Sequence, residues 1–277
     1  MSSVKKKIIS RKENSKTATE EKKTGGNSSN TEQAADTGTE DSTDNGTEAV
    51  EQSTRAGEDP ADSSPEENGK LIVIDPGHQR EQNTDVEPLG PGSSEMKQKV
   101  SSGTSGVVSG LDEYELNLQV SLKLRDELSR RGYRVIMVRE TNDVDISNAQ
   151  RAAVANDNHA DAFVRIHADG ADDSSIHGMM TICQTPDNPF NGDLYDRSRA
   201  LAECILDEMT ELTGAKRNRV WETDTMSGIN WAQVPCTIVE MGYMSNPEED
   251  EKMSTDSYQL QLADGIANGL DSYFDRQ

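Results

Sequence analysis

The chain is poor in aromatic residues: of 277 residues, three are phenylalanine, two tryptophan and six tyrosine. None of them lies within residues 1–68, where aliphatic residues are also sparse and serine, threonine, asparagine, glycine and charged residues dominate. A segment of this composition cannot bury enough apolar surface to offset the conformational entropy lost on folding. We therefore predict a disordered, low-complexity tail or linker over residues 1–69 and a folded domain over residues 70–277.

Positive charge is scarce as well. The 28 lysine and arginine residues are outnumbered by 51 aspartate and glutamate residues, which leaves a formal net charge of −23. A strongly acidic protein is repelled by phosphate backbones and by anionic lipid headgroups. The charge balance therefore argues against nucleic acid and against anionic membranes as partners.

The chain also lacks long apolar runs. No run approaches the roughly 20 apolar residues that a membrane-spanning helix needs. Lys5–Lys7 resemble the basic start of a signal peptide, but only Ile8 and Ile9 follow before charged residues return. We therefore predict neither a membrane-spanning segment nor a secretory signal peptide in this chain.

Cysteine is limited to Cys183, Cys204 and Cys236, with no CxxC spacing. An odd number of cysteines so far apart does not predict a disulfide framework or a cysteine-ligated zinc site. Each cysteine lies in an apolar stretch, so we expect all three to be small residues of the core.

From residue 70 onward, short β-branched stretches alternate with amphipathic stretches at helical spacing, which is typical of an α/β fold. The first strand, helix and next strand form a βαβ unit, so these strands should be parallel. We predict strands at Leu71–Ile74, Tyr133–Val138, Ala162–Ile166, Met179–Cys183 and Cys236–Val239, and helices at residues 111–131, Ile146–Asn158, Arg197–Leu212 and Tyr258–Phe274. A long loop over Gln79–Gly110, rich in glycine, serine and proline, is expected to be functional or mobile.

Polar residues stand where the strands are expected to end. His78 follows the first strand across the turn Asp75-Pro76-Gly77, in which proline fixes φ and glycine permits a positive φ. His167 and Glu240 follow two later strands, and Glu113 starts the first helix. Because the carboxyl ends of neighbouring parallel strands meet at one edge of a sheet, these four side chains should converge.

Two histidines and a carboxylate are a common ligand set for catalytic zinc, which leaves one position open for water. A further carboxylate can take a proton from that water and pass it to a leaving amine. Each signal alone is weak, because His78 is also compatible with an ordinary loop histidine and His159 and His177 compete as ligands. The residues themselves leave open which carboxylate binds the metal.

Four blocks occur in a fixed order and together resemble the zinc-dependent N-acetylmuramoyl-L-alanine amidases of bacterial cell walls, the amidase_3 family. The blocks are IDPGH at 74–78, GLDEYELNL at 110–118, RIHAD at 165–169 and VEMGYMSN at 239–246. The resemblance covers nearly all of residues 71–274. It implies a twisted, mainly parallel sheet flanked by helices on both faces.

Carried over by position, the resemblance makes His78, Glu113 and His167 the Zn²⁺ ligands and Glu240 the catalytic general base. Glu115 is the alternative ligand. We prefer Glu113, because the family places its glutamate five positions before the leucine that corresponds to Leu118. The implied reaction is hydrolysis, by a zinc-activated water, of the amide between N-acetylmuramic acid and L-alanine of the peptidoglycan stem peptide. The implied location is extracellular or associated with the cell wall, as for an autolysin.

Two arginines add to this expectation. Arg151 matches an arginine of the family, and we expect it to form a structural ion pair. Arg165 departs from the family pattern, because the third block reads RIHAD where SIHAN is more usual. We expect Arg165 to hold either a carboxylate of the stem peptide or an acidic side chain behind the metal ligands.

Three other activities compete with the amidase. A zinc metallopeptidase that cuts within the stem peptide would use the same metal chemistry. An inactive relative that only binds the wall would have no need for all four polar residues, yet all four are present. A phosphatase would need a glycine-rich phosphate loop or a cluster of basic residues at the strand ends, and neither is evident.

Overall fold

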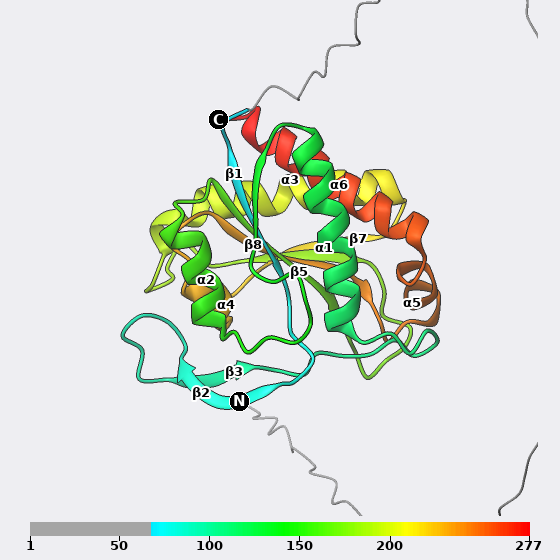
Figure 1. Cartoon of the computed structure of the whole chain (residues 1–277), viewed down its shortest axis with the longest axis horizontal. Helices are drawn as coiled ribbons and strands as arrows, with labels where there is room; N and C mark the ends of the chain where they lie inside the picture. Colours follow the sequence, from blue (N-terminus) through cyan, green and yellow to red (C-terminus); the bar gives the residue numbers. More distant parts are fainter. Residues whose placement is uncertain (1–67) are drawn as a thin grey trace, which may run out of the picture. The chain divides into compact units, whose positions relative to one another are not determined.

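The computed structural model describes residues 68–277 of the chain (Figure 1). The tail predicted over residues 1–69 falls, apart from its last two residues, outside the described part. The described residues form an α/β domain, as predicted. None of its helices combines the length and apolar composition that crossing a lipid bilayer requires.

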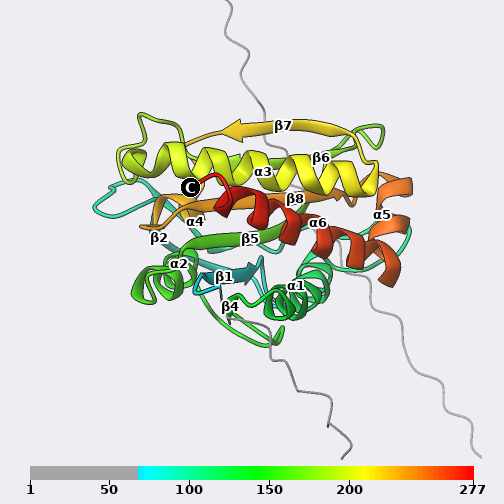
Figure 2. The same cartoon turned by 90° about the horizontal axis from the view of Figure 1, so that it is seen from above.

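A six-stranded sheet runs through the domain in the order β4-β1-β5-β8-β6-β7 (Figure 2). Four adjacent strands are parallel, and β6 pairs with β8 in the opposite direction, with β7 parallel to β6 at the edge. The prediction of a mainly parallel sheet is confirmed. The strands are β1 (Leu71–Pro76), β4 (Arg134–Met137), β5 (Ala162–Asp169), β6 (Met179–Cys183), β7 (Arg217–Glu222) and β8 (Cys236–Tyr243).

Helices cover both faces of the sheet, as predicted. On one face α1 (Glu113–Arg130), α3 (Tyr195–Thr213) and α6 (Asp256–Phe274) pack against a large apolar core. On the other face α2 (Asn148–Asp157) and the short α4 (Ser227–Asn230) close a smaller one. β1 is buried along its whole length, because alternate side chains enter the two cores. Cys183, Cys204 and Cys236 are buried free thiols, as expected.

The predicted loop over Gln79–Gly110 is only partly a loop. It contains an antiparallel hairpin of β2 (Asn83–Pro88) and β3 (Met96–Val100). The hairpin is attached to the domain by hydrogen bonds from Asn148 Nδ2 to the Lys99 carbonyl and from Trp231 Nε1 to the Pro88 carbonyl. Half of the side chains of β2 are exposed and only one is buried, and its sequence lacks the alternation of apolar and polar residues that would predict a strand.

Other differences concern the ends and the edge of the sheet. The prediction missed edge strand β7, the short helices α4 and α5 (Pro247–Met253) and the 3₁₀ turn η1 (Gly192–Leu194). The strands predicted to end at Ile166 and Val239 continue to Asp169 and Tyr243. His167 and Glu240 therefore lie within β5 and β8 rather than beyond their ends, a correction that brings them onto adjacent strands of one sheet.

Asp75 is a fully buried carboxylate at the end of β1. It accepts hydrogen bonds from Arg151 Nη1 at 2.6 Å and from Arg165 Nε at 2.8 Å, and both guanidinium groups are buried as well. Burial alone would raise the pKa of Asp75, but the charges and hydrogen bonds of Arg151 and Arg165 hold it well below its usual value. The ion pair expected of Arg151 is therefore present, and Asp75 is its partner.

We expect Asp75→Asn to lower the free energy of unfolding by about 3 kcal/mol at pH 7, because it leaves two buried guanidinium groups without a counter-charge. A carboxylate with a lowered folded-state pKa contributes stability above its unfolded pKa of about 3.9, and this contribution is lost as the pH falls. The difference between wild type and variant in urea unfolding should therefore shrink below about pH 4. Asp143→Asn, which removes an exposed ion pair with Arg80, is the control and should change little. A difference that stays constant down to pH 2 would contradict this account.

Candidate metal centre

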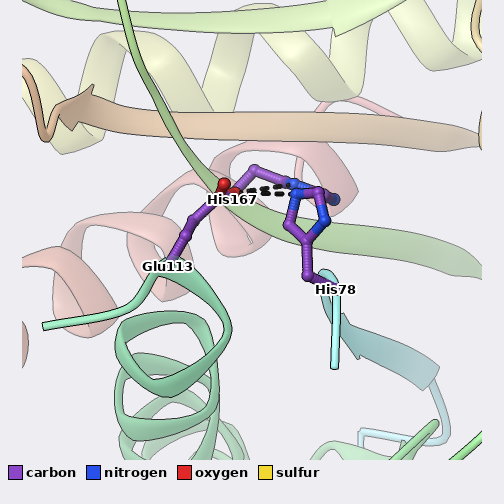
Figure 3. Close-up of side chains that lie close together, drawn as sticks. All are labelled: His78, Glu113 and His167. Carbon is purple, nitrogen blue, oxygen red and sulfur yellow. Dashed lines mark hydrogen bonds and ion pairs between the residues drawn. The ribbon is translucent and has the colours of Figure 1, made fainter. Parts of the chain in front are cut away.

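Three side chains from separate parts of the sequence meet at the carboxyl end of the parallel strands (Figure 3). Glu113 Oε1 lies 3.1 Å from His78 Nε2 and 3.1 Å from His167 Nδ1. One potential ligand atom from each residue falls within 4.8 Å of the others. The two imidazoles and the carboxylate that the sequence singled out are thus brought together.

His78 is held in an unusual backbone conformation, with φ of 59°. L-residues other than glycine rarely adopt this left-handed region, and strain of this kind is tolerated where the surroundings fix it. Here Arg151 Nη2 donates to the His78 carbonyl at 2.9 Å. The imidazole is fixed from its other side, because His78 Nδ1 lies 2.9 Å from the Ser101 carbonyl. An Nδ1–H bond to that carbonyl leaves the Nε2 lone pair free to bind a metal.

Gly77 has a different role from the one expected. The positive φ of the turn falls on His78, not on Gly77. Glycine is needed at position 77 because a Cβ atom there would overlap the imidazole of His167. The turn is thus shaped by the approach of two metal-site residues, which local sequence rules do not reveal.

Glu113 is buried at the first turn of α1, with 4% of its surface exposed. Its Oε2 accepts from the Thr104 amide at 3.0 Å, and its Oε1 accepts from Asn117 Nδ2 at 3.3 Å. Burial alone would raise the pKa of Glu113, but its interactions with the neighbouring imidazoles of His167 and His78 hold it well below its usual value. Glu113 is therefore ionised at neutral pH, which is the form that binds a cation.

The competing residues lie elsewhere. Glu115 is half-exposed on the same helix and is not part of the cluster, so the structure favours Glu113 over its alternative. His159 and His177 are exposed in connecting segments and take no part in it either. Of these candidates, only His78, Glu113 and His167 are brought together in residues 68–277.

The segment between β3 and α1 supports two of the three residues through its backbone, with the Ser101 carbonyl on His78 and the Thr104 amide on Glu113. Its far end is fastened by Asp250 of α5, which accepts from the backbone amides of Val108 and Ser109 at 2.6 and 2.8 Å. Asp250 could not be singled out from the sequence, because it is one of several consecutive acidic residues.

The residues fit a divalent cation. Burial is the main reason why the pKa of His167 is lowered to about 4, so its imidazole is neutral at pH 7. Its Nε2 atom is buried and has no hydrogen-bond partner within residues 68–277. Two imidazoles and one carboxylate are the donor set of a catalytic zinc site.

Glu240 lies beside this centre, because β8 pairs with β5 so that Glu240 is opposite His167. The pairing of the two strands shifts register directly after this pair, because the next pair is Asp169 with Tyr243. β8 therefore has one extra residue here, as in a β-bulge. Such bulges re-aim side chains near active sites. The pKa of Glu240 is raised well above its usual value, first by burial and then by the like charges of Glu113 and Asp169.

Two cavities open on the centre, and His78, His167, Ser101 and Glu240 line both. The smaller, of about 220 Å³, extends toward Arg165. The larger, of about 620 Å³, extends along the Ser101–Ser105 segment and is lined by Glu113, Asp169 and Asp172. The space around the centre therefore extends in two directions.

We expect Glu113→Gln to weaken zinc binding by more than the roughly 10–100-fold that loss of an outer hydrogen-bond partner costs, because it removes a ligand and its charge. Glu115→Gln is the matched control on the same helix and should bind zinc like the wild type. Titration of the metal-free proteins with ZnCl₂ in a calorimeter measures both. Loss of zinc binding in Glu115→Gln, with Glu113→Gln unaffected, would reverse the assignment.

Comparison with known proteins places this site in context. The chain is 30% identical over 208 residues to the uncharacterised protein YqiI of Bacillus subtilis, a match that covers 75% of this chain and 86% of YqiI. It is 29% identical over 217 residues to the probable cell wall amidase LytH of Staphylococcus aureus, covering 77% of this chain and 62% of LytH.

A solved structure shares the fold. The crystal structure of the N-acetylmuramyl-L-alanine amidase Ami1 from Mycobacterium smegmatis superimposes with a TM-score of 0.69 at 26% identity, over 76% of this chain and 100% of that one. The family model described as N-acetylmuramoyl-L-alanine amidase (Amidase_3) matches residues 72–272, which include both histidines and both glutamates of the site. The chain belongs to the N-acetylmuramoyl-L-alanine amidase family, and its reaction is the hydrolysis of an amide bond in peptidoglycan.

Proposed function

We propose that the chain is a zinc-dependent N-acetylmuramoyl-L-alanine amidase in which His78, Glu113 and His167 hold the metal and Glu240 is the general base. The observation that carries this proposal is the convergence of the three side chains on a common point, with the Glu240 carboxylate on the adjacent strand. The bond cut is the amide between the lactyl group of N-acetylmuramic acid and L-alanine.

Each of the three proposed ligands is prepared for a cation by its surroundings. His78 is oriented by the Ser101 carbonyl, Glu113 is kept ionised, and His167 is kept neutral by burial. A bound Zn²⁺ would supply Lewis acidity, which polarises the scissile carbonyl and lowers the pKa of water toward about 7.

Glu240 would handle the protons. Its carboxylate faces the same cavities as the two histidines, so it is placed to accept a proton from the attacking water. Its raised pKa suits the second half of the reaction, in which the protonated carboxyl donates to the nitrogen of L-alanine as the amide bond breaks. Its Oε2 atom has no partner among the described residues, so no internal hydrogen bond competes with either transfer.

We further propose that the enzyme acts at the bacterial cell wall, where its polymeric substrate lies, as an extracellular or wall-associated hydrolase. The support for this is the family and the probable role of LytH at the cell wall. The acidic charge of the chain makes binding through nonspecific attraction to other anionic polymers unfavourable. We therefore expect the enzyme to recognise peptidoglycan through contacts at the metal site and its two cavities.

Digestion of purified peptidoglycan followed by mass spectrometry tests the proposed bond. We expect new free L-alanine amino termini and an intact glycan. Cuts between residues of the stem peptide would indicate a metallopeptidase instead, and binding without release of fragments would indicate an inactive wall-binding protein.

Two substitutions test the division of roles. Glu240→Gln should lower kcat by about 10²–10⁴-fold while zinc binding is retained, because it removes proton transfer but no ligand. His78→Ala should lose both activity and zinc. Glu248→Gln, on the exposed side of α5, is the control and should keep both. If Glu240→Gln released the metal, Glu240 would have to be counted among the ligands.

A further inference from the structure

The smaller cavity beside the metal centre has an arginine at its base. The Arg165 side chain is 4% exposed, and it is held by Asp75 through Nε and by Asn148 Oδ1 through Nη2 at 2.8 Å. Its remaining nitrogen, Nη1, makes no hydrogen bond within residues 68–277. Because Arg165 lines the cavity, this nitrogen is available to an acceptor on a ligand that enters it.

The backbone of α4 leaves room for this guanidinium. A Cβ atom at Gly228 would overlap Arg165 Nη1, so the side chain lies directly against a glycine that lines the same cavity. On the sheet, Arg165 precedes His167 by two residues and so points to the same face of β5. The free nitrogen is thus next to the metal centre rather than in a separate part of the domain.

The charges around the cavity favour an anion. Two buried arginines, Arg151 and Arg165, line the cavity, and both are paired with the one carboxylate of Asp75. Glu240 is the one acidic side chain among the described residues that line the cavity. This surplus of positive charge stands out in a chain with a net charge of −23. The larger cavity has the opposite character, with Asp169, Asp172 and Glu113 in its lining.

The remaining lining of the smaller cavity is partly apolar, with Ile182, Met226 and Ile238. A volume of about 220 Å³ equals roughly seven water molecules of liquid. Such a space suits a group of about the size of one amino-acid residue, whose apolar part can contact these side chains. The larger cavity, with its hydroxyl-bearing segment Ser101–Ser105, suits the sugar.

We propose that Arg165 is a specificity-determining residue, whose Nη1 binds a free carboxylate on the stem-peptide residue that follows L-alanine. This inference rests on the proposed amidase function and assigns the two cavities: the peptide enters the smaller one and the glycan the larger one. In the stem peptide the residue after L-alanine is a glutamate joined through its side chain, so its α-carboxyl is either free or amidated. The free acid is the form that a guanidinium group selects.

The test compares two peptidoglycan preparations that differ only in whether this α-carboxyl is free or amidated. For the wild type, kcat/KM for release of L-alanine amino termini should be about 10–100-fold higher on the free-acid form, as expected for one hydrogen bond to a charged group. Equal rates on the two forms would overturn the proposal, while failure to cleave either form would contradict the amidase function instead.

Two variants separate recognition from folding. Arg165→Ser should reduce the ratio of the two kcat/KM values to near one, and Arg165→Lys, which keeps the charge, should retain part of it. A purely structural role for Arg165 would lower both rates together and leave the ratio unchanged, which would also overturn the proposal. Thermal unfolding identifies any variant that fails to fold. In that case the test is the ratio of the wild-type kcat/KM values on the free-acid and amidated substrates.

Discussion

The geometry of the site depends on one buried carboxylate. Asp75 ends the central strand β1, and its two oxygens hold Arg151 and Arg165, which come from α2 and β5. Through Arg151 it fixes the His78 carbonyl and with it the left-handed turn that carries a proposed ligand. Through Arg165 it fixes the base of the smaller cavity. A single ion-paired group therefore links the interior of the sheet to both the metal centre and the space for substrate.

The parts of the fold that the sequence predicted are those whose side chains are buried on both faces. β1, β5 and β8 are rich in buried apolar residues, and α1, α3 and α6 have apolar residues at helical spacing, so each carries its own signal. The sequence does not reveal the hairpin β2–β3 and the edge strand β7, because most of their side chains are exposed or half-exposed and lack a clear apolar pattern. Strand ends were placed too early because β5 and β8 continue through the polar residues of the site.

The site itself was partly readable for the same reason. His78, His167 and Glu240 each follow apolar residues of β1, β5 or β8, so topology predicts their convergence. The preference for Glu113 over Glu115 rests on the family resemblance alone until the fold places Glu113 beside the histidines. What could not be predicted lies in backbone atoms and close approaches. The Ser101 carbonyl, the Thr104 amide and the space left by Gly77 and Gly228 have no residue-type signature. Such features become visible only when residues distant in sequence are placed against one another.

The segment from Ser101 to Gly110 has a consequence for how this domain tolerates change. Nearly all of its residues are exposed, and exposed loops usually tolerate insertions and deletions. Its backbone nevertheless contacts His78, Glu113 and Asp250, so a change in its length would shift the supports of two proposed ligands at once. The tip of the hairpin at residues 91–94 is equally exposed but free of such contacts, so it is the better place for a tag, a linker or natural variation in loop length. Two neighbouring loops of similar appearance thus differ in how much variation they can absorb.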